Sequence, residues 1–157
     1  MKALSEKYSE FGILQIDAHA DLRKSYEGFT YSHASIMYNT LNEIEGVKKL
    51  VQVGVRDLCE EEWDYISQSS FRVITYFDEE LKQRQFEGQH WKQMADEIIT
   101  HLPENVYLSF DVDGLDPKLC PNTGTPVPGG LEIDQIFYLL KQVLKSGRKF
   151  IGFDLCE

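Results

Sequence analysis

The sequence predicts an α/β domain in which helices cover both faces of a mostly parallel sheet. Apolar runs of strand length alternate along the chain with segments whose apolar residues recur at helical spacing. Two of these runs end directly in acidic clusters, and the carboxyl ends of parallel strands are where open α/β folds place their sites. The 157 residues, 42% of them hydrophobic, are enough for one core and contain no repeat or linker, so we expect a single domain.

Five strands are expected, each from an apolar run bounded by polar or turn-forming residues. They cover residues 11–16, 50–55, 72–76, 106–110 and 149–153. Between them, apolar residues three or four apart predict helices from about 33 to the glycine at 46, and at 60–68, 89–102 and 132–145. In the last of these helices we expect the following side chains to point inward: Ile136, Phe137, Leu140, Val143 and Leu144. We assign no regular element to 77–88 and interpret 2–10 as a polar lead-in.

The two acidic clusters carry the chemistry of the chain. Their side chains are Asp17, His19 and Asp21 after the first strand, and Asp111 and Asp113 after the fourth. Alternate residues near the end of a strand point to the same side, so the members of each cluster can converge. Because parallel strands end at the same edge of a sheet, we expect both clusters to meet there.

Carboxylates gathered in this way repel one another, and a bound divalent metal would neutralise them. Oxygen-rich ligation with one imidazole suits Mn²⁺ or Mg²⁺ better than a structural zinc site. Four carboxylates fit two ions better than one. Taken alone, each cluster is also compatible with an ordinary strand-end turn, where Asp is common. The presence of both clusters behind apolar strands favours metal binding.

The composition excludes several classes of partner. A net charge of −10 argues against nucleic acid or an anionic membrane as partner. No apolar run reaches membrane-spanning length, and the first residues do not resemble a signal peptide. Cys59, Cys120 and Cys156 are widely spaced and form no CxxC pair, which argues against a disulfide framework or a structural zinc. We therefore expect a protein of the reducing cytoplasm.

The order of several motifs resembles the ureohydrolases, the family of arginase and agmatinase. The motifs are DAHAD at 17–21, YSHA at 31–34, VGVRD at 53–57, SFDVDGLDP at 109–117, TGTP at 123–126, the glycine pair at 129–130 and GFDLCE at 152–157. The resemblance covers nearly the whole chain, and the DAHAD and SFDVDGLDP motifs are its most specific part.

This resemblance implies a three-layer α/β/α fold of the arginase type and a centre of two Mn²⁺ ions. It also implies hydrolysis of a guanidinium group to urea and an amine, a small guanidino substrate and a homo-oligomer. By position, Asp17 and Asp111 would bridge the ions, Asp21 would bind the first, and His19 and Asp113 would bind the second.

Two further residues gain a role from the same resemblance. His33 resembles the residue that passes a proton to the departing amine, although the local sequence alone reads it as a helix-start histidine. Glu157 resembles the carboxylate that pairs with the substrate guanidinium. The loop at 123–130 resembles a wall of the active site, although Pro and Gly are equally expected in any tight loop.

The substrate is expected to be a decarboxylated or acidic analogue of arginine, such as agmatine or guanidinobutyrate. The stretch from Asp21 to Asn39 resembles agmatinases, because it lacks the Ser- and Asn-rich loop with which arginases bind the amino-acid head group. Arginases also tend to place an acid two residues after the Asp of the RD motif, where this chain has Cys59.

The family pattern also implies parts that this sequence does not contain. Family members are longer and carry an upstream Gly-Gly-Asp-His-type motif, and they continue beyond the position of Glu157. We therefore expect residues 1–157 to be an incomplete ureohydrolase domain, truncated at both ends, with weak or no activity alone.

Two alternative functions remain. The first is an inactive ureohydrolase fragment that serves as a folding or assembly module and binds at most one ion tightly. The second is a Mg²⁺-dependent phosphatase that uses the sequence from Asp111 to Gly114, although this function leaves the DAHAD cluster without a role.

Overall fold

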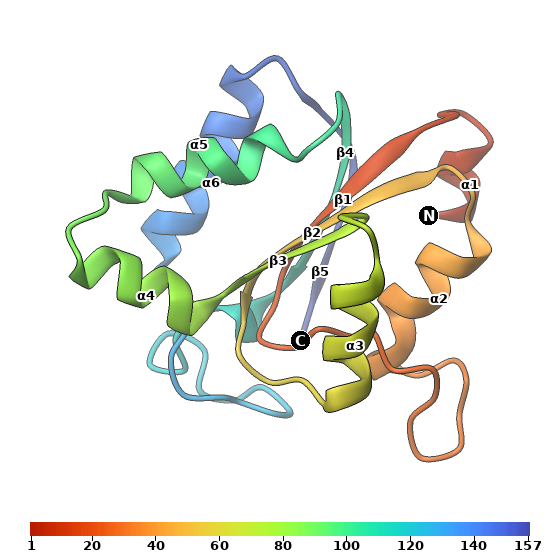
Figure 1. The fold of residues 1–157 in the computed structure, drawn as a ribbon, viewed down its shortest axis with the longest axis horizontal. Coiled ribbons are helices and arrows are strands. Elements are labelled where there is room, and N and C mark those ends of the chain that lie inside the picture. Colours follow the sequence, from red (N-terminus) through yellow and green to blue (C-terminus); the bar gives the residue numbers. More distant parts are fainter.

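The computed structural model describes residues 1–157 and contains one five-stranded sheet in which every strand pairs in parallel with its neighbours (Figure 1). The strand order is β3-β2-β1-β4-β5. The strands are β1 (Phe11–Ile16), β2 (Val47–Val55), β3 (Val73–Phe77), β4 (Asn105–Asp111) and β5 (Lys149–Cys156). All five predicted strands are confirmed, with β2 and β5 each three residues longer than the apolar runs indicated.

Six helices lie on the two faces of this sheet. They are α1 (Lys2–Ser5), α2 (Ile36–Glu43), α3 (Glu60–Gln68), α4 (Asp78–Phe86), α5 (Trp91–Thr100) and α6 (Ile133–Lys145). Figure 1 shows α4, α5 and α6 on one side of the sheet and α1, α2 and α3 on the other. The predicted three-layer α/β/α architecture is thus confirmed. The longest helix has 13 residues, and no helix combines the length and the apolar character that a membrane span requires.

The sheet separates two apolar cores, because successive strand residues point to opposite faces. One core packs Leu14 and Ile16 against α4, α5 and α6, and the other packs Ile13 against α2. The central strand β1 is buried along its whole length. Burial on both faces explains why β1 is a continuous apolar run rather than an alternating one.

The sequence pattern did not reveal helix α4. Only Leu81 and Asp78 of its nine residues are buried, so its sequence has almost no apolar periodicity. Its first turn consists of acidic residues, which is favourable at the positive end of a helix dipole, but an acidic run alone is equally typical of an exposed loop.

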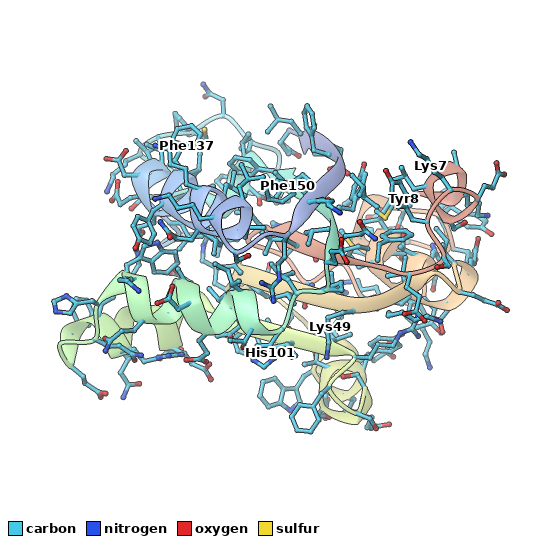
Figure 2. All side chains as sticks on the ribbon, turned by 90° about the horizontal axis from the view of Figure 1, so that it is seen from above. Lys7, Tyr8, Lys49, His101, Phe137 and Phe150 are labelled. Atoms are coloured by element: carbon cyan, nitrogen blue, oxygen red, sulfur yellow. The ribbon has the colours of Figure 1, made fainter.

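Helix α6 has a narrower inward face than we predicted. Ile136, Leu139 and Val143 are fully buried, whereas Phe137 is 50% exposed and Leu144 is 56% exposed. The prediction that Phe137 and Leu144 point inward is therefore wrong. The sheet-facing stripe of the helix is formed by the three buried residues, and Phe137 and Leu144 lie beside it. Figure 2 shows Phe137 on the outer side of α6.

The register of the sheet determines where the two acidic clusters lie. Ile16, the last residue of β1, pairs with Phe110 near the end of β4. The residues that follow the two strands, Asp17 and Asp111, therefore emerge side by side at the same edge. The chain after β4 then forms a 3-10 turn (Val112–Gly114), which brings Gly114 close to the backbone of Asp17.

Candidate metal centre

Each acidic cluster is shaped by short hydrogen bonds to its own backbone. The Asp17 Oδ1 atom accepts a hydrogen bond from the His19 amide at 2.7 Å. The Asp111 Oδ1 atom likewise accepts one from the Asp113 amide at 3.0 Å. In both clusters the first Asp thus bonds the amide two residues later, a local turn that is typical of Asp just after a strand.

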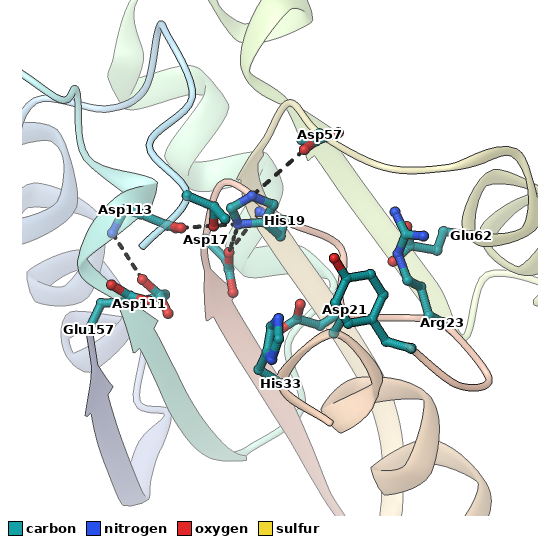
Figure 3. A pocket seen from close by; sticks show the side chains of 13 residues that line it. Asp17, His19, Asp21, Arg23, His33, Asp57, Glu62, Asp111, Asp113 and Glu157 are labelled. Carbon is teal, nitrogen blue, oxygen red and sulfur yellow. Dashed lines mark hydrogen bonds and ion pairs between the residues drawn. The ribbon is translucent and has the colours of Figure 1, made fainter. Parts of the chain in front are cut away.

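The two clusters are joined directly. The Ala18 amide donates to Asp113 Oδ1 at 3.1 Å, and His19 Nδ1 lies 3.0 Å from Asp113 Oδ2 and 3.5 Å from Asp17 Oδ1. This contact requires Gly114, because a Cβ atom there would lie 2.8 Å from the Asp17 nitrogen. The first and fourth strands thus contribute to one constellation (Figure 3).

Asp17, His19 and Asp113 form the tightest part of the constellation. One potential ligand atom from each lies within 4.8 Å of the others, and the two aspartates are each 5% exposed. Two buried carboxylates and an imidazole are a donor set that fits a divalent cation such as Mn²⁺. The three side chains are therefore close enough together, and of the right chemistry, to hold a metal ion.

The remaining predicted residues line the same cavity, which has a volume of about 180 Å³. The cavity is lined by Asp17, His19, Asp21, Arg23, Tyr26, His33, Ala34, Asp57, Glu62, Asp111, Asp113, Thr125 and Glu157. All seven predicted site residues are in this set, so the structure brings them together. Asp21 and Asp111 lie outside the tight group of three, and the roles of all seven residues stay predictions.

Crowding of the acidic groups shifts their pKa values. Burial, reinforced by the Asp17 carboxylate, raises the pKa of Asp21 to about 8. Burial also raises the pKa of Asp111 to about 7, and it raises the pKa of Asp17. Without a cation nearby, these carboxyl groups resist ionisation, which is the electrostatic condition that a bound divalent ion relieves.

His19 and Asp113 behave differently because they form an ion pair. The hydrogen bonds to Asp113 and Asp17 raise the pKa of His19 to about 10. Burial acts to raise the pKa of Asp113, but the His19 ring and the Ala18 amide outweigh it and lower the pKa. In the metal-free chain, a protonated His19 therefore supplies part of the positive charge that the cluster needs.

His33 and Glu157 lie at the margin of the cavity. His33 begins a 3-10 turn (His33–Ser35), is exposed, and packs edge-on against Tyr26 with ring centroids 5.4 Å apart. Glu157 accepts a hydrogen bond from the Gly124 amide at 2.7 Å, which ties the end of the chain to the loop after β4. Thr125 of that loop lines the cavity, as expected of the wall at 123–130.

Glu62 is a residue of this region that sequence reasoning did not single out. Its carboxylate is 2% exposed and accepts hydrogen bonds from the Leu22 and Cys59 amides, both at 2.9 Å. The Arg23 Nε atom lies 3.6 Å away. Glu62 therefore fastens the segment after Asp21 to α3. Three consecutive glutamates begin that helix, and only the packing shows which one is turned inward.

Arg56 is a second such residue. Its guanidinium donates to the carbonyl oxygens of Asp113 at 2.7 Å, Leu115 at 3.2 Å and Val127 at 3.1 Å. These contacts connect the end of β2 to both ends of the loop after β4. The RD motif was visible in the sequence, but its arginine proves to support the loop rather than line the cavity.

Comparison with known proteins agrees with this geometry. The family model described as Arginase family matches residues 1–157. An N(1)-aminopropylagmatine ureohydrolase of Thermus thermophilus is 39% identical over 157 residues, which are 100% of this chain and 49% of that protein. An agmatinase of Halalkalibacterium halodurans is 30% identical over 160 residues, covering 99% of this chain and 50% of its own length.

Among solved structures, the proclavaminate amidino hydrolase of Streptomyces clavuligerus superposes with a TM-score of 0.80 and 27% identity, covering 99% of this chain and 49% of that one. The chain thus spans about half the length of the relatives it matches. The family match over every residue, together with the two joined acidic clusters, shows that this chain belongs to the arginase family.

Proposed function

We propose that this chain carries the metal centre of a ureohydrolase that cleaves a guanidinium group to urea and an amine. The observation that carries the proposal is the meeting of the DAHAD and SFDVDGLDP clusters around one acidic cavity. The chain spans about half the length of its relatives. The proposed activity is therefore that of a protein of the relatives' length, and residues 1–157 would supply its metal centre.

Asp17, His19 and Asp113 would hold Mn²⁺, and Asp21 and Asp111 line the same cavity and would complete the ligand set of two ions. When bound, Mn²⁺ lowers the pKa of water and so supplies a nucleophile for the guanidinium carbon near neutral pH. The acidic lining of the cavity favours entry of a cationic guanidinium group. The family match supports manganese over magnesium.

The residues of the chain supply the remaining steps. One oxygen of the Glu157 carboxylate is bonded to Gly124, which fixes the side chain where the other oxygen can pair with the guanidinium. His33 is exposed at the cavity wall and would give a proton to the departing amine nitrogen. Water adds to the guanidinium carbon, the carbon–nitrogen bond to the substrate chain breaks, and urea and an amine leave.

The substrate is proposed to be a guanidino amine or a guanidino acid without the amino-acid head group of arginine. The curated relatives at 39% and 30% identity are named as an aminopropylagmatine ureohydrolase and an agmatinase, which supports this choice. Cys59 at the position where arginases tend to have an acid supports it independently.

The proposal is tested by measuring urea released from agmatine, guanidinobutyrate and arginine in the presence of Mn²⁺. Residues 1–157 and a version extended to the length of the relatives are compared, and we expect the shorter chain to be much slower. In the active form, Asp113→Asn is expected to reduce turnover about 100-fold or more, because even residues outside the ligand shell cost that order.

Asp116→Asn is the matched control, because Asp116 lies on the same loop but does not line the cavity. It should retain nearly full turnover. Absence of urea from every guanidino compound in the extended protein would overturn the proposal. Release of phosphate from a simple phosphate ester would instead favour the phosphatase alternative, and equal turnover of both lengths would contradict the expected weakness of residues 1–157.

A further inference from the structure

Two buried glutamines and a partly buried threonine form a row across the sheet that leads to the candidate metal centre. Gln15 of β1 pairs in register with Gln52 of β2, which pairs with Thr75 of β3. The two glutamines are 1% and 0% exposed. On the same face of the sheet, the residue two positions earlier in each strand is apolar and belongs to the core. Polar side chains at the next positions therefore need hydrogen-bond partners.

The three side chains are joined by hydrogen bonds that all run in one direction. Thr75 Oγ1 donates to Gln52 Oε1 at 2.7 Å, and Gln52 Nε2 donates to Gln15 Oε1 at 2.7 Å. Gln15 Nε2 then donates to Asp17 Oδ2 at 2.9 Å. The row therefore ends on a carboxylate of the candidate metal centre.

The direction of this row is imposed by a backbone carbonyl. Gln52 Nε2 also donates to the Ala20 carbonyl at 2.7 Å. A carbonyl oxygen only accepts, so the amide nitrogen of Gln52 must face Ala20, and its oxygen must face Thr75. Gln15 is oriented in turn, because its oxygen meets the Gln52 nitrogen and its nitrogen is left for Asp17.

Two members of the row, Gln15 and Gln52, contact the loop at 17–21 that carries three of the candidate ligands. Gln15 holds one oxygen of Asp17 while the His19 amide holds the other, so both carboxylate oxygens have a fixed direction. Gln52 holds Ala20, the residue before Asp21. An apolar row would pack these strands without the cost of burying two amides, but it would leave Asp17 Oδ2 without its hydrogen-bond donor.

We propose that Gln15, Gln52 and Thr75 are positioning residues that orient Asp17 and the 17–21 loop for metal binding. The inference rests on the proposed function, because it assumes that Asp17 is a metal ligand. Partners of this kind, one shell outside the ligands, commonly change metal affinity by about 10- to 100-fold when they are removed.

The sharpest test uses Thr75, which touches no candidate ligand. Thr75→Val keeps the shape of the side chain and removes the hydroxyl that holds the Gln52 Oε1 atom, whereas Thr75→Ser keeps the hydroxyl. Mn²⁺ affinity is measured by calorimetric titration, and the Mn²⁺ environment by electron paramagnetic resonance. We expect Thr75→Val to weaken binding several-fold and alter the spectrum, and Thr75→Ser to stay within about twofold of the wild type.

Gln15→Leu removes the last link and should weaken Mn²⁺ binding by about 10- to 100-fold. Thr40→Val is the matched control for Thr75→Val, because Thr40 is a buried threonine of α2 outside the row. It should leave Mn²⁺ affinity unchanged. If Gln15→Leu does not fold, the comparison of Thr75→Val with Thr75→Ser decides alone.

If the wild-type protein binds Mn²⁺ and Thr75→Val binds it with the same affinity, this inference is overturned and the proposed function stays intact. Equal weakening in Thr75→Val and Thr75→Ser would also overturn it, because the effect would then come from packing rather than from the hydroxyl. A wild-type chain that binds no Mn²⁺, even when extended, would overturn the metal site of the proposed function and the inference with it.

Discussion

His19 lies between two carboxylates and takes its charge from them. It is half-buried, which by itself would favour a neutral ring, yet its hydrogen bonds to Asp113 and Asp17 raise its pKa to about 10. Asp17, Asp21 and Asp111 also have raised pKa values, because burial and mutual repulsion favour their neutral forms. The metal-free cluster therefore holds more protons than the same groups do in the unfolded chain.

This proton uptake predicts how the stability of the metal-free protein depends on pH. A group whose pKa is raised on folding stabilises the fold below its unfolded pKa, and that contribution is lost as pH rises through the folded pKa. For Asp21 the loss runs from 3.8 to about 8, and for His19 from 6.5 to about 10. We expect the melting temperature of chelator-treated protein to be lower at about pH 8 than at about pH 5.

The measurement is thermal unfolding across this pH range with and without Mn²⁺. Addition of Mn²⁺ at the higher pH should recover the lost stability, because the cation replaces the protons. Asp21→Asn removes one of the titrating groups and should flatten the dependence. A metal-free protein that is equally stable at both pH values would contradict the prediction.

The residues with candidate roles were recognisable in the sequence where a motif is local. The DAHAD and SFDVDGLDP spacings identified five acidic or imidazole groups, and all five line one cavity. Glu62 and the Gln15–Gln52–Thr75 row were not recognisable. Their contacts join residues 23 to 40 positions apart in the chain, and no local pattern records such pairs.

At the scale of elements, the loop from 112 to 131 is closed by hydrogen bonds between its two ends. Leu131 donates to the Gly114 carbonyl at 3.0 Å, and Asp116 donates to the Leu131 carbonyl at 3.0 Å. Gly130 makes this closure possible. Its φ is +105°, and a Cβ atom there would lie 2.6 Å from the backbone of Leu115.

Gly130→Ala is therefore expected to destabilise the protein strongly. Gly147→Ala provides the matched control, because Gly147 also has a positive φ, +87°, but no atom lies within 4 Å of the added Cβ. The control should cost about 1–2 kcal/mol from backbone strain alone. Gly130→Ala adds a steric clash and should cost about 3 kcal/mol or more.

Urea unfolding of the two variants distinguishes strain from close packing. Gly130→Ala should also weaken Mn²⁺ binding, because Leu115 follows the turn that carries Asp113, whereas Gly147 lies beyond α6 and far along the chain from this turn. Equal destabilisation by the two substitutions would show that the contact with Leu115 is unimportant.

At the scale of the whole molecule, one edge of the sheet is apolar and uncovered. β5 is an edge strand, and its side chains Phe153 and Leu155 are 74% and 63% exposed. An edge strand with free backbone groups and exposed apolar side chains favours association with another chain. The expected homo-oligomer stays a prediction, and this edge is the surface at which residues 1–157 should associate.

We expect residues 1–157 to associate increasingly as concentration rises, and Phe153→Lys to shift the equilibrium toward the monomer. Light scattering coupled to size-exclusion chromatography measures this directly. Phe86→Lys is the control, since Phe86 is 86% exposed on α4, on another part of the surface. Wild-type protein that stays monomeric at every concentration would contradict the prediction.

The sequence by itself determined the order of strands along the chain, the architecture and the identity of the acidic clusters. These follow from local patterns, since apolar runs, helical spacing and turn-forming residues lie within a few positions of one another. The sequence did not determine helix α4, whose residues face mostly solvent, or the exposure of Phe137 and Leu144 on α6.

Only the tertiary structure decided which of several similar polar side chains are buried and which partners they bond. It turned Glu62 inward and left its two neighbouring glutamates exposed, and it aligned Gln15, Gln52 and Thr75 into one row ending at Asp17. For the row, the physical reason is the register of the parallel sheet. Register places distant residues opposite one another, and burial then requires every polar group among them to find a partner.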